Sequence, residues 1–212
     1  GKDIIIPFKP NVIDVPACSQ LRKRSIWSPN APSRNGEGRP TVFFFAGSHP
    51  PVKGQPKPTP YPLPVYDPPH VRADMHRLHR GTPGFKVVDS SVDAKVDLFE
   101  WMLKSQFCWV PPGQRYGDPR RHIVGAALGC IPVFTIPNGR FLFDELLPWQ
   151  GMSVVVNRSD LPKLPEILAR YSSADRERMR SQLRCAWPRF WFSSIYGACF
   201  GDDKRYDAFD AL

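Results

Sequence analysis

The chain has 212 residues, of which 42% are hydrophobic, so it is long enough for one large domain with a substantial core. Its formal net charge of +9 favours an anionic partner such as nucleic acid, an acidic glycan or a phosphorylated small molecule, with solubility alone as the alternative. No run of about 18 apolar residues predicts a membrane span, and no two of the five cysteines have paired zinc-ligand spacing, which argues against a sulfur-ligated metal.

The chain divides into a linker, a main domain and a short tail. Residues 1–38 are predicted to be the end of a preceding domain followed by a basic, turn-rich linker. Residues 39–200 form the main domain, and residues 201–212 a tail or helix. Ten of the 25 prolines fall between Pro40 and Pro69 and predict a polyproline-like insertion over residues 48–70, because proline lacks a backbone donor.

Within the main domain, short apolar runs alternate with helical patterns. Strands are predicted at 41–47, 85–89, 107–111, 130–134 and 152–157. Helices are predicted at 71–79, 91–105, 119–128 and 161–171, and again after Ser172. In the second helix, one apolar stripe would contain Val92, Val96, Phe99 and Leu103. With right-handed crossovers this alternation predicts an α/β fold, a doubly wound parallel sheet with carboxyl-terminal helices.

The loop "VPPGQRYGDPRR", which follows the third predicted strand, is the strongest candidate for a ligand site. Ligands of open parallel sheets bind beyond the carboxyl ends of the strands. Asp118 would cap the next helix and place Arg120 and Arg121 in its first turn, where cations are unfavourable unless an anion binds there. Gly113 and Gly117 would let the backbone approach a pyrophosphate. Alternatively, Asp118 neutralises the arginines and the glycines only form turns.

Residues outside this loop also bear on the candidate site and on the core. Gly47 and Ser48 follow the first strand and join the candidate site, while Gly129 is expected to end the helix that Arg121 begins. The three histidines that border the proline-rich segment are interpreted as surface residues rather than metal ligands: His70, His76 and His79. The aromatic residues near the end are interpreted as core rather than as a base-stacking platform: Trp187, Phe190, Trp191 and Phe192.

Several known chemistries are not indicated. The chain contains neither G-x-G-x-x-G nor G-x-x-x-x-G-K-[ST], which argues against nicotinamide dehydrogenases and P-loop nucleotidases, and it has no G-x-S-x-G elbow. No nucleic-acid module is recognised, so nucleic acid is not an expected partner.

Four segments occur in an order that resembles the exostosin-like glycosyltransferases: "RPTVFFFAG", "MLKSQFCWVPPGQ", "RRHIVGAALGCIPVF" and "FDELLPWQGMSVVVNRSDLPKLPEIL". The likeness covers roughly residues 39–200, and "KDIIIPF" is similar to the exit from that family's first domain. The resemblance implies a two-Rossmann-domain enzyme on the lumenal side of the Golgi membrane, anchored by an amino-terminal helix outside this chain. Such an enzyme transfers a sugar from a nucleotide sugar to a glycan or cell-wall polysaccharide. This chain would be chiefly the carboxyl-terminal, donor-binding half.

The resemblance also implies donor contacts by particular residues, namely Gly113, Arg121, Phe143, Asp144 and Glu145. Many members carry Glu, and others Gln, six residues before the cysteine of "GCIPV", to hydrogen-bond the nucleotide. Val124 stands there instead and can supply neither a hydrogen bond nor a proton, so weaker donor binding is expected. An alternative is therefore a catalytically degenerate homologue that binds a glycan or a partner protein.

The expected partners are thus a nucleotide sugar and a glycan acceptor, with membrane contact only through the anchor. No metal ligands are assigned and no cofactor is required, because arginines can stabilise a leaving diphosphate; a divalent cation stays open. No catalytic residue is assigned. A lumenal location would permit a disulfide between Cys108 and Cys130, which lie near the ends of the two predicted strands that flank the helix at 119–128.

Overall fold

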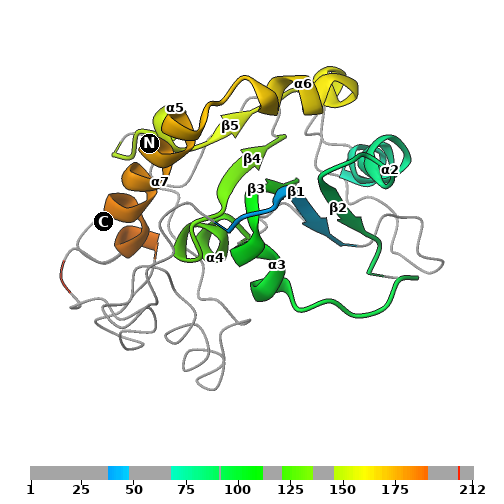
Figure 1. Cartoon of the computed structure of the whole chain (residues 1–212), viewed down its shortest axis with the longest axis horizontal. Helices are drawn as coiled ribbons and strands as arrows, with labels where there is room; N and C mark the ends of the chain where they lie inside the picture. Colours follow the sequence, from blue (N-terminus) through cyan, green and yellow to red (C-terminus); the bar gives the residue numbers. More distant parts are fainter. Residues whose placement is uncertain are drawn as a thin grey trace, which may run out of the picture.

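The computed structural model describes residues 38–47, 68–90, 92–111, 121–135, 146–190 and 205, and the observations below concern these residues. They build a five-stranded sheet of order β2-β1-β3-β4-β5 in which every pair of neighbours is parallel (Figure 1). The strands are β1 (Thr41–Ala46), β2 (Phe85–Val88), β3 (Ser105–Val110), β4 (Ile131–Phe134) and β5 (Val154–Val155). The prediction of a parallel α/β sheet is confirmed.

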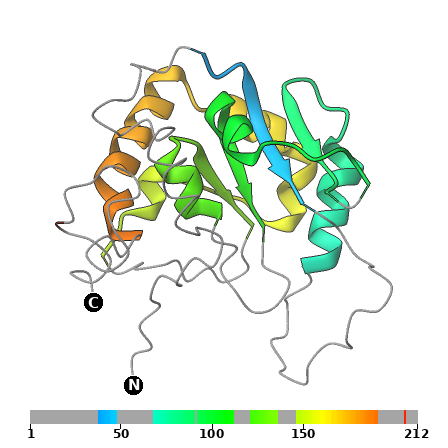
Figure 2. The same cartoon turned by 90° about the horizontal axis from the view of Figure 1, so that it is seen from below.

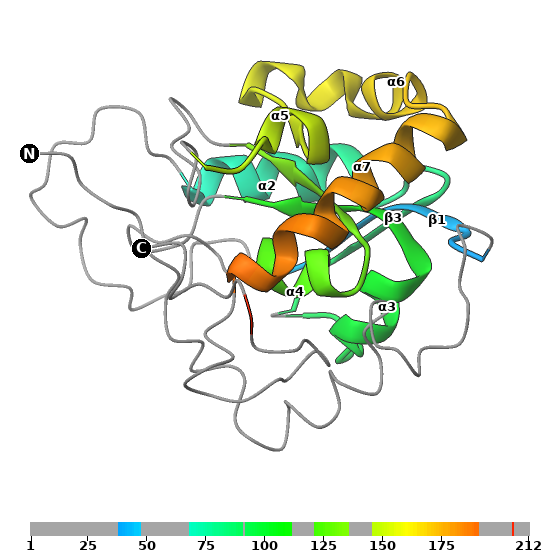
Figure 3. The same ribbon diagram turned by 90° about the vertical axis from the view of Figure 1, so that its left-hand side faces the viewer.

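Helices cover both faces of this sheet. They are α2 (Pro68–His79), α3 (Leu98–Lys104), α4 (Arg121–Ala127), α5 (Trp149–Met152), α6 (Leu164–Ala169) and α7 (Ser173–Ala186), with 3₁₀ helices η1 (Arg158–Lys163) and η2 (Trp187–Phe190). Figures 1 and 3 show α3 and α4 on one face and α2 and α6 on the other. In Figure 2, α7 runs beside α4, with which it is in contact. None of the helices in the described ranges is long and apolar enough to cross a bilayer.

The central strands are buried on both sides, as their continuous apolar runs predict. Phe43, Phe44 and Phe45 in β1 are at most 1% exposed, and Phe107 and Trp109 in β3 are equally enclosed. Because successive side chains of a strand point to opposite faces, a strand buried throughout needs a helical layer on each side. The doubly wound arrangement supplies both layers.

Helix α3 is shorter than the sequence predicts. It begins at Leu98 and not at residue 91, because the Asp97 side chain accepts hydrogen bonds from the backbone N–H groups of Phe99 and Glu100 and caps the helix there. Val92 is 72% exposed in a turn, so the expected apolar stripe does not start with it. Met102 is the buried residue of the helix.

The segment between β4 and α7 also departs from its prediction. The expected helix over 161–171 is a 3₁₀ helix up to Lys163 followed by α6, because Pro162 and Pro165 lack the N–H that a continuous α-helix needs. The predicted strand over 152–157 is reduced to Val154–Val155, since Met152 completes α5. Elsewhere in the chain, helix α2 starts at Pro68 and not at residue 71, so its first residues lie within the insertion predicted for residues 48–70.

Gly129 ends α4 as predicted. It has a φ of +69°, its N–H donates to the carbonyl of Ala126, and the N–H of Cys130 donates to the carbonyl of Gly125. These two hydrogen bonds around a residue in the left-handed conformation form the Schellman motif. It turns the chain directly into β4.

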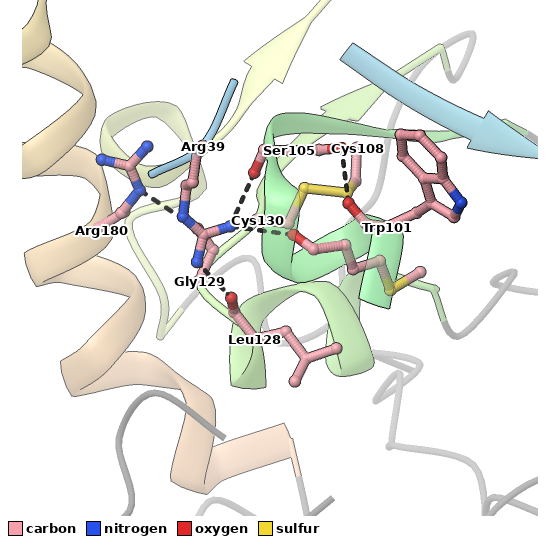
Figure 4. The surroundings of a disulfide bond; sticks show 9 residues. Arg39, Trp101, Ser105, Cys108, Leu128, Gly129, Cys130 and Arg180 are labelled. Atoms are coloured by element: carbon pink, nitrogen blue, oxygen red, sulfur yellow. Dashed lines mark hydrogen bonds between the residues drawn. A yellow bond between two sulfur atoms is a disulfide. The ribbon is translucent and has the colours of Figure 1, made fainter. Parts of the chain in front are cut away.

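The predicted disulfide is present between Cys108 of β3 and Cys130, whose Cα atoms are 5.7 Å apart (Figure 4). Beside it, the buried guanidinium of Arg39 donates to three backbone carbonyls at the ends of α3 and α4, those of Met102, Ser105 and Leu128. Helix ends leave carbonyls without intrahelical partners, and a cation is well suited to them. The bridge and Arg39 thus bind α3, α4 and the strands together.

Candidate functional site

The sheet order changes direction between β1 and β3, because the chain goes from β1 outward to β2 and then returns to build β3, β4 and β5 on the other side. At such a switch point the loops diverge and leave a crevice beyond the carboxyl ends of the two strands. Gly47 follows β1, and α4 is the helix that follows β3. The sequence-predicted site residues Gly47, Arg121 and Val124 lie in this region. Six others fall outside the described residues: Ser48, Gly113, Arg120, Phe143, Asp144 and Glu145.

Gly47 is fixed by its backbone on two sides. Its N–H donates to the carbonyl of Val88 in β2 over 3.0 Å, and its carbonyl lies 3.0 Å from Nε2 of His76 in α2. A Cβ at this position would lie 2.8 Å from Cζ of Phe45 and 3.2 Å from Nη2 of Arg121. A Cβ here would force the Phe45 ring to shift and would crowd the arginine at the end of β1.

Arg121 is the first residue of α4, and its side chain reaches across to β1. Its guanidinium carbon lies 5.4 Å from the centroid of the Phe45 ring, within the range of a cation–π contact. No carboxylate of the described residues forms an ion pair with it. The guanidinium lies near Gly47 at the end of β1, the sheet edge at which the sequence predicts an anion.

A second arginine, Arg72 of α2, acts on Arg121. Arg72 is only 7% exposed. Burial and, to a smaller extent, the positive charge of Arg72 together lower the pKa of Arg121 to about 10. Arg121 remains protonated at neutral pH, so two cationic groups share one partly enclosed region. Sequence reasoning missed Arg72, although it stands four residues before His76 and hence on the same face of α2.

Val124 lies one turn after Arg121 on α4, and both residues are partly exposed. Residues three apart on a helix are neighbours, so position 124 lies next to position 121 on the surface of α4. Val124 also packs against the core. The structure thus places the residue that departs from the family pattern next to the candidate anion-binding arginine.

The interpretation of His76 and His79 as surface residues is wrong. They are 6% and 3% exposed, because the inward face of α2 carries them together with Met75. His79 Nε2 lies 2.7 Å from the carbonyl of Leu161 in η1, and burial lowers the pKa of its imidazole. In the described ranges, no group of three potential ligands could hold a metal ion. The side chain of His70 lies outside the described part.

The interpretation of the terminal aromatic residues as core is confirmed for Trp187 and Phe190, which are 5% and 1% exposed. The Phe190 ring stacks on Trp149 with centroids 5.2 Å apart. The buried ring of His122 lies edge-on to both. Trp191 and Phe192 fall outside the described residues.

Comparison with known proteins agrees with this arrangement. The exostosin GT47 domain profile matches residues 2–171, which starts earlier than the resemblance noted from the motifs. The probable glycosyltransferase At5g25310 of Arabidopsis thaliana is 31% identical over 115 residues, which are 54% of this chain and 22% of that protein. Another from the same plant, At3g07620, is 37% identical over 75 residues, 34% of this chain and 15% of that protein.

A rice protein, the probable glucuronosyltransferase Os01g0926700 of Oryza sativa subsp. japonica, is 33% identical over 97 residues, 46% of this chain and 22% of that protein. The matched region thus spans about a fifth of At5g25310 and about a fifth of this rice protein, 22% of each. Since the profile covers most of the chain, the resemblance deduced from four motifs is confirmed. The chain belongs to the exostosin GT47 family.

Proposed function

We propose that this chain is the donor-binding part of a glycosyltransferase, which holds a nucleotide sugar while the sugar is transferred to a glycan or cell-wall polysaccharide. One observation carries the proposal. Arg121 reaches the end of β1 beside Gly47, at the switch point of the sheet, where it feels the charge of Arg72, and no carboxylate of the described residues pairs with Arg121. A nucleoside diphosphate has the charge that this position lacks.

The chemical role follows from where charge develops. When the bond between the anomeric carbon and the diphosphate breaks, negative charge grows on the departing phosphate oxygens. A fixed guanidinium in a partly enclosed site stabilises that charge in the transition state and can donate two parallel hydrogen bonds. The proposal requires no metal for this step. The remaining donor contacts are proposed to come from Ser48, Gly113 and Arg120, and from residues 143–145.

The cellular setting is part of the proposal. The buried disulfide between Cys108 and Cys130 supports an oxidising compartment, and we propose that the domain lies on the lumenal side of the Golgi membrane.

The name of a relative suggests which donor sugar to test. The rice relative is named a glucuronosyltransferase. A cationic donor site is compatible with a donor sugar that carries a carboxylate, so UDP-linked uronic acids are donors to test first.

Calorimetric titration of the full chain with UDP tests the proposal. Arg121→Ala is expected to weaken binding at least about tenfold, since a hydrogen-bonded charge contributes roughly 1.5–3 kcal/mol. Arg178→Ala is the matched control, because that arginine is 66% exposed on α7 and pairs with Asp175. Equal UDP affinities for the wild type and Arg121→Ala would contradict the proposal.

A second candidate is a degenerate homologue that binds acidic glycan through its basic surface. Val124 favours it, because valine offers the nucleotide no hydrogen bond at a position beside Arg121. Such a protein would give no heat with UDP, yet it would be retained on a sulfated-glycan column and eluted by salt. Saturable UDP binding would exclude this candidate.

A further inference from the structure

Helix α2 presents two polar residues to the end of β1. His76 and Arg72 are four residues apart, and the 3.0 Å contact between His76 Nε2 and the Gly47 carbonyl places their shared face against this strand end. As the crossover between two parallel strands, α2 runs antiparallel to them, and its first turns lie at the carboxyl edge of the sheet (Figure 2). Arg72 therefore lies one turn, about 6 Å along the helix axis, nearer that edge than His76.

Arg121 approaches the same strand end from α4, on the other face of the sheet. Its Nη2 lies 3.2 Å from the position that a Cβ of residue 47 would occupy, and its guanidinium lies over the ring of Phe45. The charge of Arg72 is felt there, since it lowers the pKa of Arg121. Two like charges that interact repel each other, and a bound group with two or more negative charges is attracted to both.

We propose that Arg72 is a second diphosphate-binding residue, and that Arg72 and Arg121 hold the diphosphate of the donor between α2 and α4. This inference rests on the proposed function and extends it to a residue that neither the motifs nor the family resemblance indicates. It also specifies the ligand class: two guanidinium groups arriving from different helices match two linked phosphates better than one. The site should therefore prefer diphosphates to monophosphates.

The test compares the full chain with Arg72→Gln in titrations with inorganic pyrophosphate, UDP and UMP. Arg72→Gln should weaken binding of pyrophosphate and UDP at least about tenfold and binding of UMP much less. Arg77→Gln is the control on the same helix, since Arg77 is 69% exposed and pairs with Asp74. It should bind all three ligands as the wild type does.

Because Arg72 is buried, Arg72→Gln could fail to fold, so a second measurement uses the wild-type chain. In ¹⁵N-edited spectra of the guanidinium Nε–Hε groups, pyrophosphate should shift the resonances of both Arg72 and Arg121. UDP binding that shifts Arg121 and leaves Arg72 unmoved would overturn the inference while the proposed function stands. Pyrophosphate shifting both arginines, with UDP giving no binding, would support the arginine pair and contradict the proposed function. Absence of binding by all three ligands would contradict both.

Discussion

The guanidinium of Arg121 and the ring of Phe45 crowd the position that a Cβ of residue 47 would take. Its Nη2 lies 3.2 Å from the ideal Cβ position of residue 47, and the Phe45 ring lies closer still, at 2.8 Å. Gly47 is not in a left-handed conformation, so the need for glycine here is one of space. This links a backbone position in the loop after β1 to the placement of an arginine that begins α4.

Gly47→Ala should therefore disturb the site more than its single methyl group would suggest. Phe45 is 1% exposed and packs edge-on against Trp109, so the methyl forces the ring or the arginine to move. We expect a loss of about 1–3 kcal/mol in the free energy of unfolding, the usual result of overpacking, together with weaker UDP binding. Urea denaturation and calorimetry measure the two effects.

Gly81→Ala is the matched control, since a Cβ at Gly81 would meet nothing within 4 Å. It should leave stability and UDP affinity unchanged. If Gly47→Ala behaved like Gly81→Ala, Arg121 would not need the space beside residue 47.

The disulfide should contribute substantially to stability. It closes a loop with a sequence separation of 22 residues, and in the chain-entropy account a loop of this length stabilises the fold by about 3 kcal/mol. The double variant Cys108→Ala, Cys130→Ala should lose roughly that amount in urea denaturation. Cys185→Ala, which removes an exposed free thiol on α7, should lose little. Equal stability of all three proteins under oxidising conditions would show that the bridge contributes nothing.

His79 should make the stability of the fold depend on pH. Burial lowers the pKa of its imidazole below the ordinary 6.5, and hydrogen bonding to the Leu161 carbonyl only partly opposes this. The unfolded chain then binds a proton more readily than the folded chain. The contribution of His79 is complete above the unfolded pKa and is lost as the pH falls from that value through the lower folded one.

Unfolding free energies of wild type and His79→Gln, measured between about pH 5 and 7, check this linkage. Glutamine can still donate to Leu161 but does not titrate, so its pH profile should be flatter. Arg80→Gln, which removes a neighbouring exposed arginine that pairs with Asp93, should keep the wild-type slope. Identical slopes for wild type and His79→Gln would contradict the assignment.

The strands were predictable because their signal is local. A run such as Thr41–Ala46 is apolar on both faces, which indicates a strand covered by two layers regardless of what covers it. The apolar pattern predicts a helix that starts at residue 91. Helix α3 starts at Leu98 instead, because the Asp97 side chain caps it there. Local pattern sets the type of an element more reliably than its ends.

The site was only partly predictable, for a different reason. Arg121 was found because the edge of a parallel sheet and a helix start can both be inferred from the sequence. Arg72 and the buried histidines were not, since their roles depend on contacts between distant segments. His76 contacts Gly47 across 29 residues, and His79 contacts Leu161 across 82. Such contacts fix the rotation of α2 about its axis, which its own sequence leaves undetermined.

Position 124 offers a direct way to strengthen nucleotide binding. Val124 is partly exposed, stands one turn from Arg121, and supplies no hydrogen bond at a position where the family resemblance implies Glu or Gln. Val124→Gln should raise the UDP affinity about three- to tenfold, which corresponds to one net hydrogen bond. Glutamine is preferred to glutamate for the test because a carboxylate three residues from Arg121 would also pair with the guanidinium and compete with the phosphate.

Val124→Leu is the control for this change, since leucine adds volume without polar groups. It should bind UDP no better than the wild type, and its unfolding free energy reports any cost of crowding against the core that Val124 contacts. A gain in affinity for Val124→Leu equal to that for Val124→Gln would show that packing, and not a hydrogen bond, limits binding. No gain for a folded Val124→Gln would mean that the nucleotide does not come within reach of this face of α4.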